Sequence, residues 1–158
     1  MHIRLASEAD VLALADLFQQ TVLRRGAEHY TPEQVRAWAA FGTDLQKFRP
    51  FILDATTFVA VDSTDATKIL GFAGIAEDGH VTSSYVRHNC IHQGVGSAMM
   101  QTLLSYAQNH DMQRLYAEAS LFSLGLFKKF GFQLYDIEIV ERHGVSFERY
   151  LVERIHGL

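Results

Sequence analysis

Residues 85–98 of the chain read Tyr85-Val86-Arg87-His88-Asn89-Cys90-Ile91-His92-Gln93-Gly94-Val95-Gly96-Ser97-Ala98. The residues up to Val86 predict the end of a strand, and Gly94 and Gly96 predict the start of a helix. The first N–H groups of a helix lack partners within it and lie at the positive end of its dipole, which suits a phosphate. Glycine has no Cβ to hold an anion away from those groups. The stretch therefore predicts a phosphate-binding junction. The alternative is a simple turn from strand to helix, in which the glycines serve only tight packing.

Two common phosphate motifs do not fit this junction. A dinucleotide fingerprint needs a third glycine three residues after Gly96, where the chain has Met99. A P-loop needs a Gly-Lys-Ser/Thr run, and residues 85–98 contain no lysine. The junction is therefore of another kind.

Hydrophobic periodicity and turn residues predict further helices and strands on both sides of this junction. A first helix follows a cap at Ser7, and a second follows Thr31-Pro32. Strands are expected at 2–5, 57–61, 68–76, 80–86, 113–119, 132–141 and 146–153, and later helices at 94–109 and 122–130, with a short helical turn at 45–48. The order predicts an α/β (α+β) fold that closes with a hairpin about His143-Gly144.

Composition excludes several classes of protein. The chain has 158 residues, 14 Lys and Arg against 18 Asp and Glu, and a net charge of −4, so it lacks the positive excess of a nucleic-acid binder. Its single cysteine, Cys90, forms no internal disulfide, and no apolar stretch is long enough for a membrane span. We expect one domain over residues 1–158 and, with no signal peptide in the first residues, a cytoplasmic location.

The junction resembles the pyrophosphate loop of the GNAT superfamily of N-acetyltransferases, which reads Gln/Arg-x-x-Gly-x-Gly/Ala between a strand and a long helix. Ile91-His92-Gln93-Gly94-Val95-Gly96 matches it without gaps, and Leu126-Phe127-Lys128-Lys129-Phe130-Gly131-Phe132 is similar to a later segment of that family. The resemblance covers essentially the whole chain. It implies a mixed, mostly antiparallel central sheet flanked by helices. It also implies that the strands before Gly94 and Ser120 are parallel neighbours that splay around the pantetheine arm of a cofactor.

The implied activity is transfer of an acetyl group from acetyl-CoA to a primary amine. The resemblance and the anion-binding argument assign one set of residues to the cofactor: Tyr85, Val86, Arg87, Ile91, His92, Gln93, Gly94, Val95, Gly96, Ser97 and Phe127. Three of them depart from the family pattern. Ile91 replaces a polar residue, His92 stands where glycine is usual, and Phe127 replaces a tyrosine that reprotonates the leaving thiolate in many relatives.

Glu118 is the candidate general base, because an acidic residue near the end of this strand serves some relatives in that role. Strand alternation places it on one face with Tyr116 and Ser120. A carboxylate satisfied by a structural partner is the alternative reading, and Glu77 and Glu141 are weaker candidates. Ser120 is a weak candidate for the missing acid, as are Tyr85 and Tyr116.

The remaining expectations concern metals, partners and rival functions. His88-x-Cys90-x-His92 lies inside the predicted phosphate loop, so no metal is expected there. The acceptor is a small-molecule or peptide amine, with no nucleic acid and no membrane as partner, and a homodimer through the closing strands stays open. The rival function is a non-catalytic module that binds or senses acyl-CoA.

Overall fold

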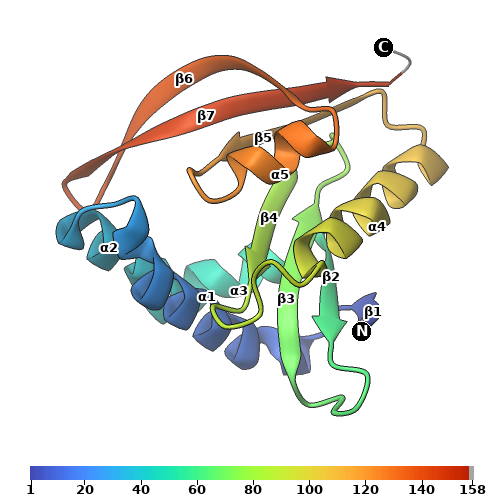
Figure 1. Cartoon of the computed structure of the whole chain (residues 1–158), viewed down its shortest axis with the longest axis horizontal. Helices are drawn as coiled ribbons and strands as arrows, with labels where there is room; N and C mark the ends of the chain where they lie inside the picture. Colours follow the sequence, from blue (N-terminus) through green and yellow to red (C-terminus); the bar gives the residue numbers. More distant parts are fainter. Residues whose placement is uncertain (157–158) are drawn as a thin grey trace.

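The computed structural model describes residues 1–156 and alternates strands with helices along the chain (Figure 1). The strands are β1 His2–Leu5, β2 Thr56–Val61, β3 Ile69–Ile75, β4 Val81–Val86, β5 Arg114–Ala119, β6 Gln133–Arg142 and β7 Val145–Ile155. The α-helices are α1 Val11–Arg25, α2 Pro32–Ala39, α3 Leu45–Leu53, α4 Val95–Asn109 and α5 Leu124–Lys129. Short 3₁₀ helices lie at Glu8–Asp10, Gly26–Glu28 and Ala40–Thr43. The predicted α/β class is confirmed.

The strands form two antiparallel sheets, with the orders β1-β2-β3-β4 and β5-β7-β6. The sheets meet at a single isolated parallel bridge, which pairs His80, just before β4, with Tyr116 of β5. Beside it, the N–H of Tyr116 donates to the carbonyl of Gly79 over 3.1 Å. β4 and β5 are thus parallel neighbours at their amino ends, as predicted, and they separate beyond that point.

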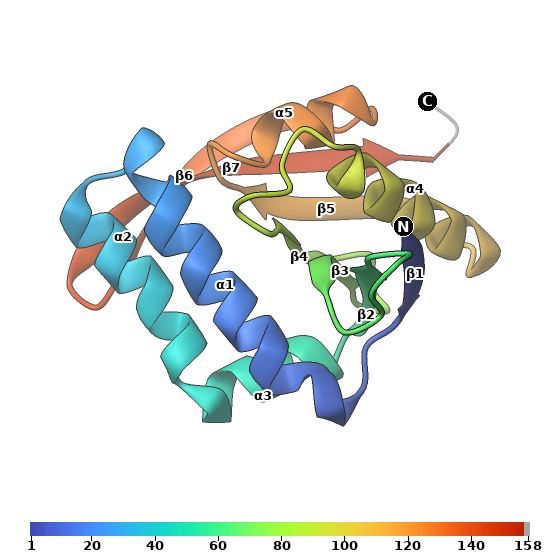
Figure 2. The same cartoon turned by 60° about the horizontal axis from the view of Figure 1, so that its bottom comes forward.

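Helices cover both sides of the first sheet (Figure 2). On one side α4 buries Met99 and Leu103 in a core that also holds side chains of β5 and α5. On the other side α1, α2 and α3 pack on the sheet around Phe18, Phe48 and Phe72. The separating ends of β4 and β5 therefore lie between two helical layers. Within residues 1–156, no helix has both the length and the apolar character needed to cross a membrane.

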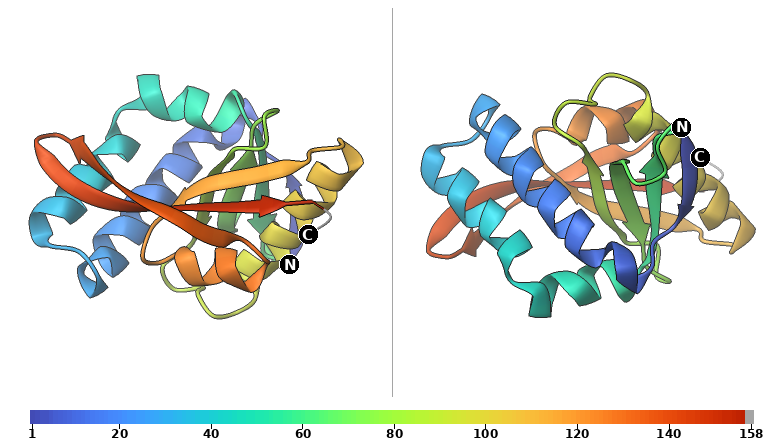
Figure 3. Two further views of the ribbon diagram at one scale, coloured as in Figure 1. Left: turned by 90° about the horizontal axis from the view of Figure 1, so that it is seen from above. Right: turned by 90° about the horizontal axis from the view of Figure 1, so that it is seen from below.

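The closing hairpin of β6 and β7 extends to α2 (Figure 3). Gln34 of α2 donates from Nε2 to the carbonyl of Ser146 over 3.0 Å. At the tip, His143 and Gly144 have φ values of 53° and 75°, as a two-residue type I′ turn requires, so the hairpin predicted about these residues is confirmed. The tip of the hairpin is therefore tied to α2.

Helix α3 is longer than the short turn expected at 45–48, because it continues through Pro50 to Leu53. Proline removes one helical hydrogen bond and usually ends or kinks a helix. Phe48 and Ile52 on either side of Pro50 are fully buried in the core beneath α1. Burial of these two large side chains outweighs the loss of one hydrogen bond.

Candidate functional site

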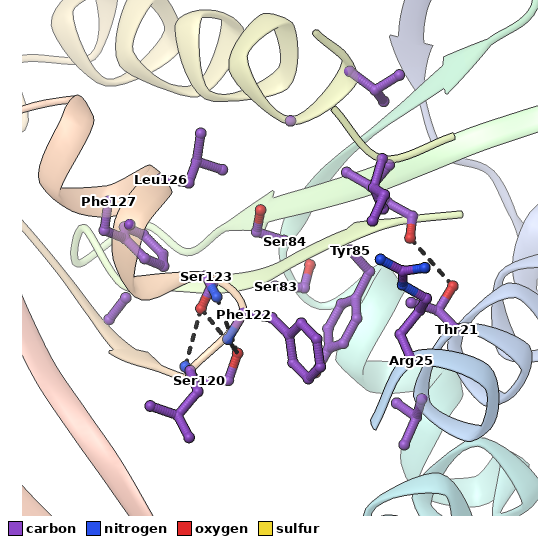
Figure 4. Close-up of a pocket in the computed structure, with 18 of the residues that line it drawn as sticks. Thr21, Arg25, Ser83, Ser84, Tyr85, Ser120, Phe122, Ser123, Leu126 and Phe127 are labelled. Atoms are coloured by element: carbon purple, nitrogen blue, oxygen red, sulfur yellow. Dashed lines mark hydrogen bonds between the residues drawn. The ribbon is translucent and has the colours of Figure 1, made fainter. Parts of the chain in front are cut away.

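A cavity of about 760 Å³ lies where β4 and β5 separate, between α1 and α2 on one side and α4 and α5 on the other (Figure 4). Its volume is within the range of sites that hold a small molecule or a cofactor arm. The wall combines the carboxyl ends of both strands, the α4 start and the residues that lead into α5. The cavity therefore lies directly against the predicted phosphate junction.

A bulge in β4 turns backbone groups toward this cavity. Gly74 of β3 pairs with Ser83 and Ile75 pairs with Val81, which leaves Thr82 without a partner in β3. After this extra residue, the N–H of Arg87 bonds to the carbonyl of Leu70 over 2.7 Å. Residues of an antiparallel strand alternate in the direction of their N–H groups, so those of Ser84 and Val86 point away from β3 and into the gap.

The loop between β4 and α4 presents a row of free N–H groups beside the cavity. Gly94 caps the helix with φ +84°, and His92 has φ +59°. Both are left-handed conformations, which glycine adopts most readily. The first helical bond runs from the N–H of Ala98 to the carbonyl of Gly94 over 3.0 Å. Within residues 1–156, the backbone N–H groups of 91–97 donate no hydrogen bond. These groups can receive a phosphate without breaking any internal bond.

Most of the residues expected at a cofactor line this cavity. They are Tyr85, Val86, Ile91, His92, Gly94, Val95, Gly96, Ser97 and Phe127. Arg87 and Gln93 lie outside the wall, and Arg87 donates from Nε to the carbonyl of Ile69 over 2.6 Å, which draws its guanidinium toward β3. Lys129 supplies a cation, since its Nζ donates to the hydroxyl of Ser97 over 3.0 Å. Lys129 of α5 is therefore the cation that directly contacts the start of α4.

Glu118 and Ser120 also line the cavity, but their side chains already have partners. The hydroxyl of Ser120 accepts from the N–H groups of Phe122 and Ser123, each over 3.2 Å, and so caps the turn before α5 (Figure 4). Nε2 of His80 lies 2.8 Å and 3.1 Å from the two carboxylate oxygens of Glu118. This bond lowers the pKa of Glu118 and raises the pKa of His80. Glu118 is therefore ionised at neutral pH and firmly held.

The tyrosines considered as replacements for the missing acid are weak acids here. Burial raises the pKa of Tyr85 to about 12, and the phenol of this residue accepts a hydrogen bond from Trp38 over 3.3 Å. The hydroxyl of Tyr116 donates to Asp78, and this bond raises its pKa to about 12 as well. Phe127 is buried against Phe132 and has no proton to give. Proton donation from these tyrosines to a thiolate, whose usual pKa is about 8.5, is therefore unfavourable.

Several residues of the wall were not predicted to line the cavity. Thr21 donates from its hydroxyl to the carbonyl of Val86 over 3.2 Å, and Arg25 lies beside it (Figure 4). Phe122 lines the cavity near Tyr85. Arg25 Nε and Ser83 Oγ are buried without a hydrogen-bond partner within the described chain. Strand alternation from Tyr85 could have identified Ser83, whereas no local signal marks Thr21 or Arg25.

Across residues 1–156, no group of three or more His, Cys, Asp and Glu side chains is arranged to hold a metal ion. Cys90 is buried, and its thiol donates to the side-chain carbonyl of Asn89 over 3.4 Å.

Comparison with known proteins gives a consistent family. A family model described as an acetyltransferase (GNAT) domain matches residues 26–153. Over 150 residues the chain is 24% identical to the uncharacterized N-acetyltransferase YafP of Escherichia coli (strain K12), which covers 95% of this chain and 93% of that protein.

Solved structures agree with this match. A GCN5-related N-acetyltransferase from Rhodopseudomonas palustris superposes with a TM-score of 0.91 at 22% identity, over 98% of this chain and 94% of that one. The PaiA N-acetyltransferase from Thermoplasma acidophilum, solved in complex with coenzyme A, gives a TM-score of 0.76 at 14% identity over 99% and 100% of the two chains. The fold is therefore shared with both.

Proposed function

This chain belongs to the GNAT superfamily of N-acetyltransferases and is an acyltransferase, and from that premise we propose that it transfers an acetyl group from acetyl-CoA to a primary amine by direct attack in a ternary complex. The acceptor is a small-molecule or peptide amine. The single cysteine, Cys90, is buried in the loop before α4, and its thiol bonds to the side-chain carbonyl of Asn89 rather than to a base, which disfavours a covalent acyl-enzyme.

The observation that carries the proposal is the continuity between the free N–H groups of 91–97 and the cavity between β4 and β5. Coenzyme A has a pyrophosphate and a long, thin arm that ends in the thiol. The residues fit such a molecule, because the amides suit the pyrophosphate and the neighbouring gap suits the arm. A Cβ at Gly96 would lie 3.3 Å from a side-chain carbon of Leu126, so this glycine allows the start of α4 to pack closely against α5.

The N–H groups of Ser84 and Val86 support a role in binding the acetyl carbonyl. Negative charge grows on that oxygen when the amine attacks, and fixed donors that face the gap stabilise it. The N–H of Val86 suits this role better than that of Arg87, since the N–H of Arg87 is already bonded to the carbonyl of Leu70.

Glu118 is our candidate for the group that removes a proton from the acceptor. An alkylamine with a pKa of about 10.4 is mostly protonated at neutral pH, and only the neutral form attacks. The carboxylate of Glu118 lines the cavity and is ionised, so it can accept this proton directly or through a water molecule.

The decisive experiment has a binding arm and a turnover arm. Acetyl-CoA at 100 times its dissociation constant should stabilise the protein by about 2.7 kcal/mol and raise Tm by about 5 to 10 °C. Release of free thiol is then followed with a panel of small amines, peptides with a free N-terminus and peptides with an internal lysine. We expect release to depend on both acetyl-CoA and one class of amine.

Three outcomes would change the proposal. No thermal shift with millimolar acetyl-CoA would exclude the cofactor site. Binding without thiol release would favour a module that only senses acyl-CoA. Faster release with succinyl-CoA or propionyl-CoA would reassign the acyl donor while keeping the site.

A further inference from the structure

His80 and Glu118 form a close pair at the point where the two sheets meet. The imidazole lies 2.8 Å and 3.1 Å from the two carboxylate oxygens, and both side chains are partly buried, at 29% and 25% exposure. Glu118 lines the cavity, whereas His80 does not. The histidine therefore lies behind the carboxylate as seen from the cavity.

The imidazole is held in this place from several sides. Its ring stacks on Tyr116 with the centroids 4.8 Å apart and an interplanar angle of 11°. Asp78 accepts hydrogen bonds from the hydroxyl of Tyr116 and, over 3.1 Å, from the backbone N–H of His80. On β7, Arg149 lies 3.9 Å from Glu118 and donates from Nε to Glu138 over 2.8 Å. Asp78 and Arg149 are thus the charged groups that act on the pair from its neighbours.

One hydrogen bond dominates the protonation of both partners. It raises the pKa of His80 against the opposing effect of burial, with smaller increases from the charges of Glu118 and Asp78 and a small decrease from Arg149. It also lowers the pKa of Glu118. A proton taken up by the coupled pair therefore resides on His80 rather than on the carboxylate.

We propose that Glu118 and His80 act as one base, in which Glu118 faces the acceptor amine and His80 is a positioning residue that receives the proton. This inference rests on the proposed function. An N–H bond of the ammonium breaks, and its electron pair stays on nitrogen. The proton passes through Glu118 to His80, so the pair then consists of ionised Glu118 and protonated His80. His80 then releases this proton to solvent from the exposed part of its ring.

The remaining steps balance without another reactant. The neutral amine forms a bond to the carbonyl carbon, the carbon–sulfur bond breaks, and the thiolate takes the electron pair of that bond. The attacking nitrogen loses its second proton, which neutralises the thiolate. The net products are the amide, the free thiol and one proton.

The first test replaces His80 with glutamine, which keeps a donor for Glu118 but cannot take up a proton. We expect kcat/KM at pH 7.5 to fall roughly 10- to 100-fold, less than for complete loss of a general base. The ratio of wild-type to His80→Gln kcat/KM should rise with pH and level off above the pKa of the pair, which lies above the free-histidine value of about 6.5. The acceptor's own ionisation cancels in this ratio.

A matched control uses His110, which also stacks on a tyrosine, Tyr106, but is exposed at the far end of α4. His110→Gln should leave both the rate and the pH profile unchanged. A wild-type to His80→Gln ratio that does not vary with pH would overturn the proposal, because a purely structural contact changes the rate without changing the titration.

A second test needs no turnover and so separates this proposal from the proposed function. NMR titration of the imidazole should give His80 a pKa above 6.5 in the wild type and a lower one in Glu118→Gln. An unchanged His80 titration in that variant would refute the pairing even in an active enzyme. If no amine is acetylated but this titration holds, the proposed function fails and the coupled pair remains.

Discussion

Glu118 combines access to the cavity with a fixed imidazole partner behind it, and this combination makes its replacement informative. In Glu118→Gln the amide keeps the size of the side chain and removes the base. We expect kcat to fall by about 10²- to 10⁴-fold at neutral pH with the affinity for acetyl-CoA nearly unchanged. The defect should shrink as the pH approaches the pKa of the amine, about 10.4, where solvent supplies the neutral nucleophile.

The measurement is kcat against pH for both proteins with one accepted amine. Glu77→Gln is the control, since Glu77 is exposed in the turn before β4 and lies outside the cavity wall. A loss in Glu118→Gln that is the same at every pH would assign this residue to structure alone.

The junction of β4 and α4 depends on backbone groups, so a single added charge is expected to disable it. In Gly96→Asp a carboxylate enters the row of free N–H groups at the α4 start, where it opposes the pyrophosphate. Close approach of like charges costs several kcal/mol, so affinity for coenzyme A should fall about 100-fold or more. The fold should survive, because an acidic side chain is favourable at a helix N-terminus.

Calorimetric titration with coenzyme A measures this loss, and circular dichroism checks the fold. Gln101→Asp places the same charge on the exposed face of α4 and should bind as the wild type does. Wild-type affinity in Gly96→Asp would mean that the phosphates bind elsewhere.

Gly79 lies at the place where the two sheets join. This residue has φ +91°, and a Cβ there would lie 2.0 Å from the carbonyl oxygen of Arg114, next to the bond between the sheets. Gly79→Ala should therefore destabilise the protein by about 1–3 kcal/mol from crowding, in addition to about 1–2 kcal/mol of backbone strain.

Gly94→Ala isolates the strain, since Gly94 has φ +84° and nothing within 4 Å of its Cβ position. Urea unfolding without ligand compares the two variants. Equal losses of stability would show that the contact between the sheets carries no special weight.

Local features of this chain follow from residues that are close in sequence. The His143-Gly144 turn, the start of α4 at Gly94 and the face that Glu118 shares with Tyr116 depend on turn chemistry, capping and strand alternation. These features were predicted because neighbouring residues suffice to specify them. Helix α3 was the exception, because burial of Phe48 and Ile52 carries it through Pro50.

The amino-acid sequence by itself determined the order of elements, the glycine-opened helix and the candidate residues on β4 and β5. Only the tertiary structure decided that β7 lies between β5 and β6, that the strands divide into two sheets, and that His80 meets Glu118 across 38 positions of chain. It likewise brought Thr21 and Arg25 of α1 to the cavity. Such contacts join distant segments, and they depend on how whole sheets and helices pack rather than on any local pattern.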